Sequence, residues 1–170
     1  MLLFRAQEYN QIAADEKTIY DTVKNLILTK GADTFLFGSK SKFDELCHEV
    51  VTELKKEYPH IKRIYVRAEF PYIDESYRKF ILKKYEDTFY PESIMNAGKA
   101  AYVERNYTMI NMSDYCICYY DEGYLPPRRK KGRKELFEYQ PESGTKIAYE
   151  YAGKKGLNIY NANSDNVTKY

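Results

Sequence analysis

The chain has no tryptophan and, among its 170 residues, only two histidines and three cysteines. A structural zinc site takes about four His, Cys or acidic ligands. Cys116 and Cys118, two residues apart in a predicted strand, do not form a set of four zinc ligands with His48 and His60, which lie elsewhere in the chain. An odd number of cysteines also argues against a disulfide framework and favours a reducing compartment. We therefore expect a cytoplasmic protein without a metal site, with Cys116 and Cys118 buried on one face of a strand.

Long apolar runs and a strong excess of one charge are also missing. No segment approaches the roughly 20 apolar residues that span a membrane, so we expect no membrane partner. The 27 Lys and Arg against 25 Asp and Glu leave a net charge of +2, which does not mark the whole molecule as a nucleic-acid binder. Any electrostatic function must therefore be local.

The length of the chain suits one domain with its own hydrophobic core. We expect a single domain over residues 1–170, which includes three segments of unusual sequence. These segments are an atypical N-terminal stretch, a basic loop and a tail that frays at the C-terminus, at residues 1–14, 122–140 and 162–170.

Two kinds of apolar pattern alternate along the chain. Helical spacing, at intervals of three and four residues, predicts helices near 15–30, 39–58, 77–85, 97–113 and 143–155. Short β-prone runs predict strands at 34–38, 62–68, 114–121 and 157–161, with a remnant of a first strand at 2–6. Strands separated by helices pair in parallel through right-handed crossovers. The sequence therefore predicts an α/β fold: a three-layer sandwich with a Rossmann-like, mainly parallel sheet of about five strands and helices on both faces.

Ligands of such sheets bind beyond the carboxyl ends of the strands. Gly38 and Ser39 follow one predicted strand, and Ser143, Gly144 and Thr145 begin a helix after another. Both positions are starts of helices, where exposed amides and the helix dipole favour an anion. An ordinary turn with a helix cap explains either position alone, but two at one edge favour a phosphate or carboxylate ligand. Arg67 and Asp121 follow the remaining strand ends.

Arg105 and Asn106 lie on the helix that precedes the strand "DYCICYYD". One interpretation places both side chains on a solvated helix face, and the spacing alone favours it. The other interpretation lets the guanidinium fork of Arg105 reach a ligand phosphate.

The stretch "YVERNYTMINMSDYCICYYD", followed by "SGTKIAYEYA", resembles the SLOG superfamily of Rossmann-like proteins. That superfamily includes the Lonely Guy nucleotide phosphoribohydrolases, the DNA-processing Smf proteins and many small bacterial proteins. Glu104, Arg105 and Met109 match the Glu-Arg and Met of the Lonely Guy helix, and Gly144-Thr145 match its Gly-Thr loop. The resemblance covers roughly residues 16–161 and implies a nucleotide-type ligand at these positions. The superfamily often self-associates, which implies a homodimer.

The departures from the family pattern bear on catalysis. Three residues after Thr145, where the hydrolases keep a catalytic glutamate, this chain has Ala148. Glu150 is two positions later and points about 200 degrees away around a helix. Cleavage of a glycosidic bond through an oxocarbenium-like state needs a positioned carboxylate. Within the superfamily the chain resembles the small bacterial branch most closely, whose members usually begin with a strand that ends in Gly-His-Arg at the mouth of the ligand site. Here "MLLFRAQEYN" stands in its place, with Arg5 as a weak match.

A basic run, "RRKKGRK", lies between the predicted strand at 114–121 and the turn at Ser143. Its charges can grip nucleic-acid phosphates, can close as a lid over an anionic ligand, or can form a solvated loop. The lid and the solvated loop are equally supported, and the absence of a recognition-helix pattern makes sequence-specific DNA reading the weaker interpretation. The cationic residues of the lid are Arg128, Arg129, Lys130, Lys131 and Arg133.

The leading hypothesis is a protein that binds a nucleotide or nucleotide-derived anion without turning it over, as a sensor, and that needs no other cofactor. One alternative is a nucleotide or nucleoside N-glycosidase, in which Glu104, Asp121 or Glu150 supplies the carboxylate. The second alternative is a nucleic-acid accessory protein that uses the basic run.

Overall fold

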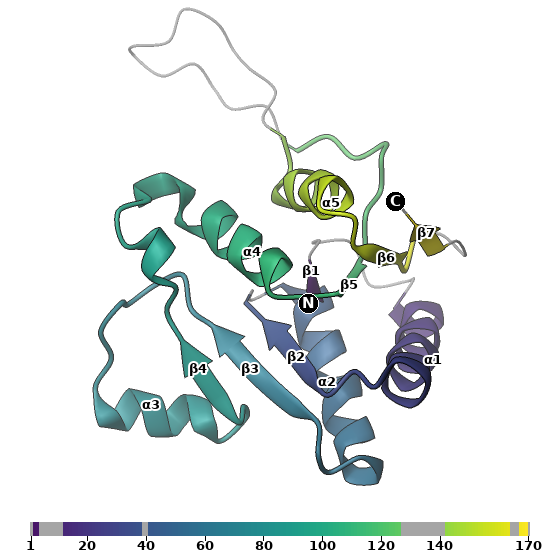
Figure 1. Ribbon diagram of the computed structural model, residues 1–170, viewed down its shortest axis with the longest axis horizontal. Coiled ribbons are helices and arrows are strands. Elements are labelled where there is room, and N and C mark those ends of the chain that lie inside the picture. Colours follow the sequence, from purple (N-terminus) through teal and green to yellow (C-terminus); the bar gives the residue numbers. More distant parts are fainter. Residues whose placement is uncertain (1, 4–11, 39–40, 127–141, 164–166, 170) are drawn as a thin grey trace, which may run out of the picture.

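The computed structural model describes residues 2–3, 12–38, 41–126, 142–163 and 167–169 (Figure 1). Helices and mainly parallel strands alternate along this part of the chain, so the protein is α/β. Its helices are α1 Ile12–Lys30, α2 Lys42–Glu57, α3 Glu75–Leu82, α4 Ala101–Asn111 and α5 Gly144–Lys154, with 3-10 turns η1 Glu92–Ile94 and η2 Gly98–Ala100. Its strands are β1 Leu2–Leu3, β2 Thr34–Phe37, β3 Lys62–Val66, β4 Asp87–Phe89, β5 Tyr115–Cys118, β6 Asn158–Asn161 and β7 Val167–Lys169.

The described strands form two sheets, with the orders β2-β3-β4 and β1-β5-β6-β7. All the pairings are parallel except that of β6 with β7. The expected single sheet of about five strands is therefore not confirmed. The reason lies at β1, which has only two residues and pairs with β5 at Ile117 and Cys118, so that β2 remains the edge strand of its own sheet.

Side chains of the central strands alternate between two hydrophobic clusters, as the period of two in a strand requires. Phe35 and Phe37 of β2 and Ile117 of β5 pack with α1 and α2. Leu36 of β2 and the β5 cysteines pack with α4 and α5 on the other face. Helices therefore cover both faces of the strands, and Figure 1 shows α2 and α4 on opposite sides of β2.

Two strands and several helix starts differ from the sequence prediction; α2, for example, begins at Lys42 after the cap Ser41 and not at Ser39. β4 was not predicted, because three residues carry little periodic signal. It pairs with β3, and beside this pairing Glu86 accepts hydrogen bonds from the Arg63 backbone at 2.6 Å and from Arg63 Nη2 at 2.8 Å. β7 lies in the tail that we expected to fray, and it pairs with β6. α1 begins at Ile12, ahead of the expected cap at Asp15.

The cysteine prediction is confirmed, because Cys116 and Cys118 are buried in the same cluster and both are free thiols. Burial raises the pKa of the Cys47 thiol, and a hydrogen bond with Cys116 together with burial raises the pKa of Cys118. Within the described ranges, no group of three His, Cys, Asp or Glu side chains is placed to hold a metal ion. None of the helices described is long and apolar enough to cross a membrane.

Candidate functional site

The carboxyl end of β2 meets α4 at Gly38. A Cβ atom at this position would lie 2.7 Å from Cζ and from Nη1 of Arg105, and 2.8 Å from Sδ of Met109. Real Cβ atoms essentially never approach other heavy atoms so closely. Glycine at this position therefore lets the guanidinium of Arg105 pack directly against the backbone, and any larger residue would have to displace Arg105 and Met109. This is a second role besides the turn that the sequence suggested.

Arg105 is 2 % exposed, and it is the largest fully buried side chain among the described residues. Its Nη1 donates to the carbonyl of Val66 at the end of β3 (3.4 Å), and its Nε donates to Oδ1 of Asn106 (3.1 Å). The ring of Tyr102 lies 5.6 Å from its Cζ. The interpretation of Arg105 and Asn106 as a solvated helix face is therefore wrong. α4 directs both side chains inward, toward the ends of β2 and β3.

A buried carboxylate accompanies this buried cation. Asp44, in the first turn of α2, is buried, and its charge acts on Arg105. Burial lowers the pKa of Arg105, and the negative charge of Asp44 opposes that shift, followed by smaller contributions from Tyr65, Tyr102 and Glu69. Sequence reasoning missed Asp44. Its only signal was an acidic residue in a first helical turn, which is common as a partner of the helix dipole.

Both candidate helix starts are capped by their own serines. Ser41 Oγ accepts from the Asp44 amide of α2 (3.2 Å), and Ser143 Oγ accepts from the Lys146 amide of α5 (3.0 Å). These caps use the amide of the third helical residue. Among the described residues, none accepts a hydrogen bond from the amides of Gly144 and Thr145. Within the described residues, the first two amides of α5 therefore have no acceptor, as is common at the start of a helix, where anions can bind.

α5 lies beside α4. The rings of Tyr107 and Tyr151 stack with centroids 3.9 Å apart, and the Tyr151 hydroxyl donates to Oδ1 of Asn111 (3.1 Å). These contacts join the C-terminal halves of two helices that run in the same direction (Figure 1). The N-terminal ends of α4 and α5 therefore lie toward the same end of the strands.

Arg67, at the end of β3, is buried, but its hydrogen bonds go to the chain itself. Its Nη1 donates to the carbonyls of Phe70 and Pro71, and its guanidinium lies 5.8 Å from the centre of the Tyr90 ring. Burial lowers its pKa. Its Nε has no hydrogen-bond partner within the described part of the chain. Arg67 therefore anchors the turn that follows β3.

Asp121 Oδ1 accepts a hydrogen bond from the Gly123 amide at 2.9 Å. Ser39 and the cationic residues of the proposed lid lie outside the described residues; these are Arg128, Arg129, Lys130, Lys131 and Arg133. Of the predicted site residues, the structure brings together Gly38, Arg105 and Asn106.

The position expected for a catalytic glutamate is part of the core. Ala148 is fully buried in the cluster that contains Met109 and Ile110. Glu150 is exposed, and its carboxylate lies 3.8 Å from Nζ of Lys146. Neither residue places a carboxylate beside Arg105.

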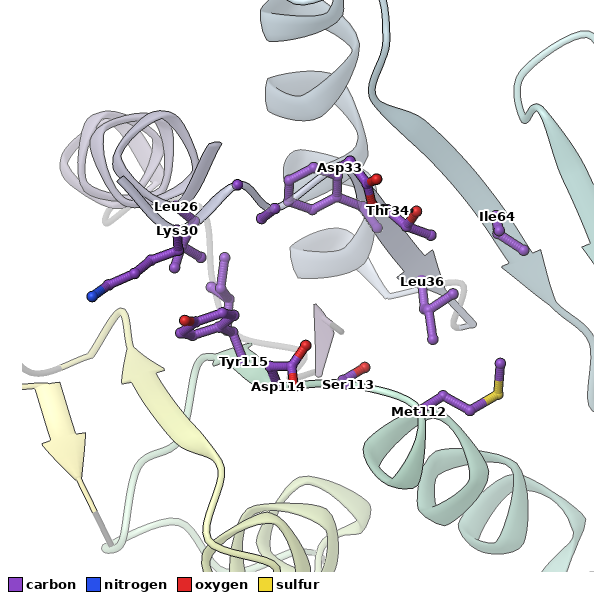
Figure 2. A pocket seen from close by; sticks show the side chains of 14 residues that line it. Leu26, Lys30, Asp33, Thr34, Leu36, Ile64, Met112, Ser113, Asp114 and Tyr115 are labelled. Carbon is purple, nitrogen blue, oxygen red and sulfur yellow. Dashed lines mark hydrogen bonds between the residues drawn. The ribbon is translucent and has the colours of Figure 1, made fainter. Parts of the chain in front are cut away.

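A pocket of about 300 Å³ lies at the opposite, amino ends of β2 and β5 (Figure 2). Its apolar wall includes Leu26 and Leu36, and its polar rim includes Asp33 and Asp114. The rule that ligands bind at carboxyl ends does not lead to this pocket. Its location separates it from Gly38 and Arg105.

Comparison with known proteins supports the resemblance noted in the sequence. A search of curated proteins finds no match. A family model described as the YspA SLOG family matches residues 2–149. This range includes Gly38, Arg105 and the start of α5. The chain belongs to the YspA SLOG family.

Proposed function

We propose that the protein binds a nucleotide or nucleotide-derived anion at the carboxyl ends of β2 and β3, without cleaving it. The proposal treats the two sheets as halves of one Rossmann-like sheet, with the ligand at the edge lined by Gly38, Arg105 and the start of α5. The observation that carries it is the burial of the Arg105 guanidinium against Gly38.

A buried guanidinium is costly unless its charge and donors are satisfied. Arg105 donates to its chain neighbour Asn106 and, over a longer distance, to the Val66 carbonyl, and Asp44 supplies a buried negative charge that acts on it. Buried charges of this kind concentrate at functional sites, although structural ion pairs also produce them. A phosphate beside Arg105 would receive a planar, bidentate donor, and the amides of Gly144 and Thr145, at the start of α5, would add donors.

Binding without turnover is supported by Ala148 and Glu150. A glycosidic bond needs a carboxylate that protonates the leaving group or activates water. Ala148 packs into the core, and Glu150 faces solvent beside Lys146. This arrangement favours a binding protein over the glycosidase alternative.

A thermal-shift panel of mono-, di- and cyclic nucleotides and nicotinamide dinucleotides tests the proposal. We expect at least one anionic nucleotide to raise the melting temperature of the wild type, by the mass-action stabilisation of the folded state. The matching nucleosides, which lack phosphate, serve as controls. No stabilisation by any anionic nucleotide would contradict the proposal.

Turnover is measured separately. We expect no free base when each stabilising nucleotide is incubated with the protein and the mixture is resolved by chromatography. Release of base that is lost on Glu104→Gln, Asp121→Asn or Glu150→Gln would establish the glycosidase instead.

A further inference from the structure

α3 lies at the periphery of the molecule, beyond β4 (Figure 1). Ile81 is the only residue of this helix that is buried. An isolated helix of eight residues is too short to be stable in water, and helices in proteins draw their stability from a packed apolar face. α3 instead turns apolar rings toward solvent. Within the described part of the chain, no helix or strand packs on this exposed face of α3.

The exposed rings form one surface, the α3 patch, which consists of Phe70, Tyr72, Tyr77 and Phe80. Their exposed fractions range from 38 to 83 %. Tyr77 stacks on Phe80 with centroids 6.3 Å apart, and Phe70 meets Tyr77 edge-on at 6.1 Å. The patch is hollowed beside Tyr72, where a shallow pocket of about 340 Å³ opens.

The backbone beneath the patch is strained in a way that displays Phe70. Phe70 has a φ of 55°, in the left-handed region that non-glycine residues avoid. Such a conformation costs about 1–3 kcal/mol and persists only where the surroundings enforce it. Arg67 enforces it, because it donates to the carbonyls of Phe70 and Pro71. The hydrogen bonds from buried Arg67 therefore stabilise the backbone conformation in which the Phe70 ring is exposed.

We propose that the α3 patch binds the α3 patch of a second copy of this chain, in a two-fold symmetric dimer. A two-fold axis between Tyr77 and Phe80 lays the two helices antiparallel and sets Tyr77 opposite Phe80 of the copy. Taking roughly 200 Å² for one whole aromatic side chain, the patch exposes about 500 Å². This is more than half of the about 800 Å² that each partner buries in a standard interface.

Charge along α3 selects this partner and this direction. Asp74 and Glu75 lie at the N-terminal end of the helix, and Lys83 and Lys84 follow its C-terminal end. Antiparallel packing brings each acidic end to the basic end of the copy, whereas parallel packing brings like charges together. The two cations in the middle of α3 already pair within the chain, Arg78 with Asp87 and Lys79 with Glu75, so the patch offers no continuous basic face to a nucleic acid.

Sedimentation equilibrium of the full chain over a dilution series tests the proposal. We expect a mass that approaches twice 20.1 kDa at high concentration. Phe80→Glu should weaken the dimer by about 100-fold, as expected for a central aromatic anchor. Leu28→Glu, at a similarly exposed apolar residue on α1, should leave the dimer intact. A wild type that stays monomeric, or a dimer that survives Phe80→Glu, would overturn the proposal.

A charge exchange tests the antiparallel direction. Glu75→Lys cancels the charge of Asp74 at the N-terminal end of α3, and Lys83→Glu cancels the charge of Lys84 at the C-terminal end, so each variant loses attraction between unlike ends and should dimerise more weakly alone. An equimolar mixture of the two variants should form a heterodimer, because the basic C-terminal end of the first then meets the acidic N-terminal end of the second. A mixture that associates no better than either variant would refute this geometry. Circular dichroism checks that each variant folds. Nucleotide stabilisation of Phe80→Glu separates a failed dimer from a failed ligand site.

Discussion

Gly38→Ala probes the closest contact in the candidate site. The added methyl would lie 2.7 Å from the Arg105 guanidinium and 2.8 Å from Met109 Sδ. Ordinary van der Waals contact begins near 3.4 Å, so these neighbours must retreat by about 0.7 Å. Arg105 and Met109 are both buried, so moving them disturbs other packed side chains. Overpacking of this kind costs about 1–3 kcal/mol, and we predict a loss of that size in the free energy of unfolding.

Urea denaturation measures this loss, and Gly144→Ala is the matched control. A Cβ at Gly144 meets no heavy atom within 4 Å. Alanine favours a helix over glycine by up to about 1 kcal/mol, so this change should be neutral or stabilising. In an Arg105→Ala background, Gly38→Ala should cost much less, because its main obstacle is gone. A Gly38→Ala protein as stable as the wild type would refute the close packing of Arg105 on β2.

Three further predictions follow from contacts elsewhere in the fold. Glu86→Gln should lower the free energy of unfolding in urea by about 1 kcal/mol. Burial raises the pKa of Glu86, but pairing with Arg63 outweighs it and lowers that pKa, so the stabilisation is present above the ordinary carboxyl pKa and is lost as pH falls through the pKa of the folded state. An acid-unfolding profile that is the same in Glu86→Gln and wild type would contradict this. His48 packs between Phe37 and Tyr85, and burial lowers its pKa. The free energy of unfolding should therefore fall by at most about 1.4 kcal/mol per pH unit as pH drops below the ordinary histidine pKa. His48→Phe should remove this pH dependence, and a dependence that persists in the variant would show that another group causes it. Ala148→Glu should cost at least about 2 kcal/mol, because it places a carboxyl group in the core, and it should not create base-releasing activity; a stable, active variant would contradict the buried position of Ala148.

Local patterns predicted the elements whose signals lie within a few residues. The run at 114–121 became β5, and the Ser143 cap with its following apolar spacing became α5. The period of two in a strand placed Cys116 and Cys118 on one face. β4 was missed because its three residues are held by pairing with β3, whose register no local pattern encodes.

Burial of Arg105 could not be predicted for a related reason. The guanidinium is held by Gly38 and by the charge of Asp44, both of which lie far from Arg105 in sequence. From spacing alone, a Glu-Arg-Asn segment on a helix is typical of a solvated face. Only tertiary packing shows that a glycine at one strand end leaves space for an arginine from a later helix. The family resemblance pointed to Arg105 as a site residue, but it did not predict that Arg105 is buried against Gly38.

Titration calorimetry of the wild type and of Arg105→Lys, with the nucleotide that stabilises the wild type most, tests the binding site directly. Lysine keeps a positive charge for Asp44 but loses the planar fork that fits a phosphate. We predict that Arg105→Lys weakens nucleotide binding by at least about tenfold, a loss of about 1.4 kcal/mol, while Arg78→Lys, on exposed α3, leaves it unchanged. Equal nucleotide affinity in wild type and Arg105→Lys would contradict a ligand site at Gly38 and Arg105.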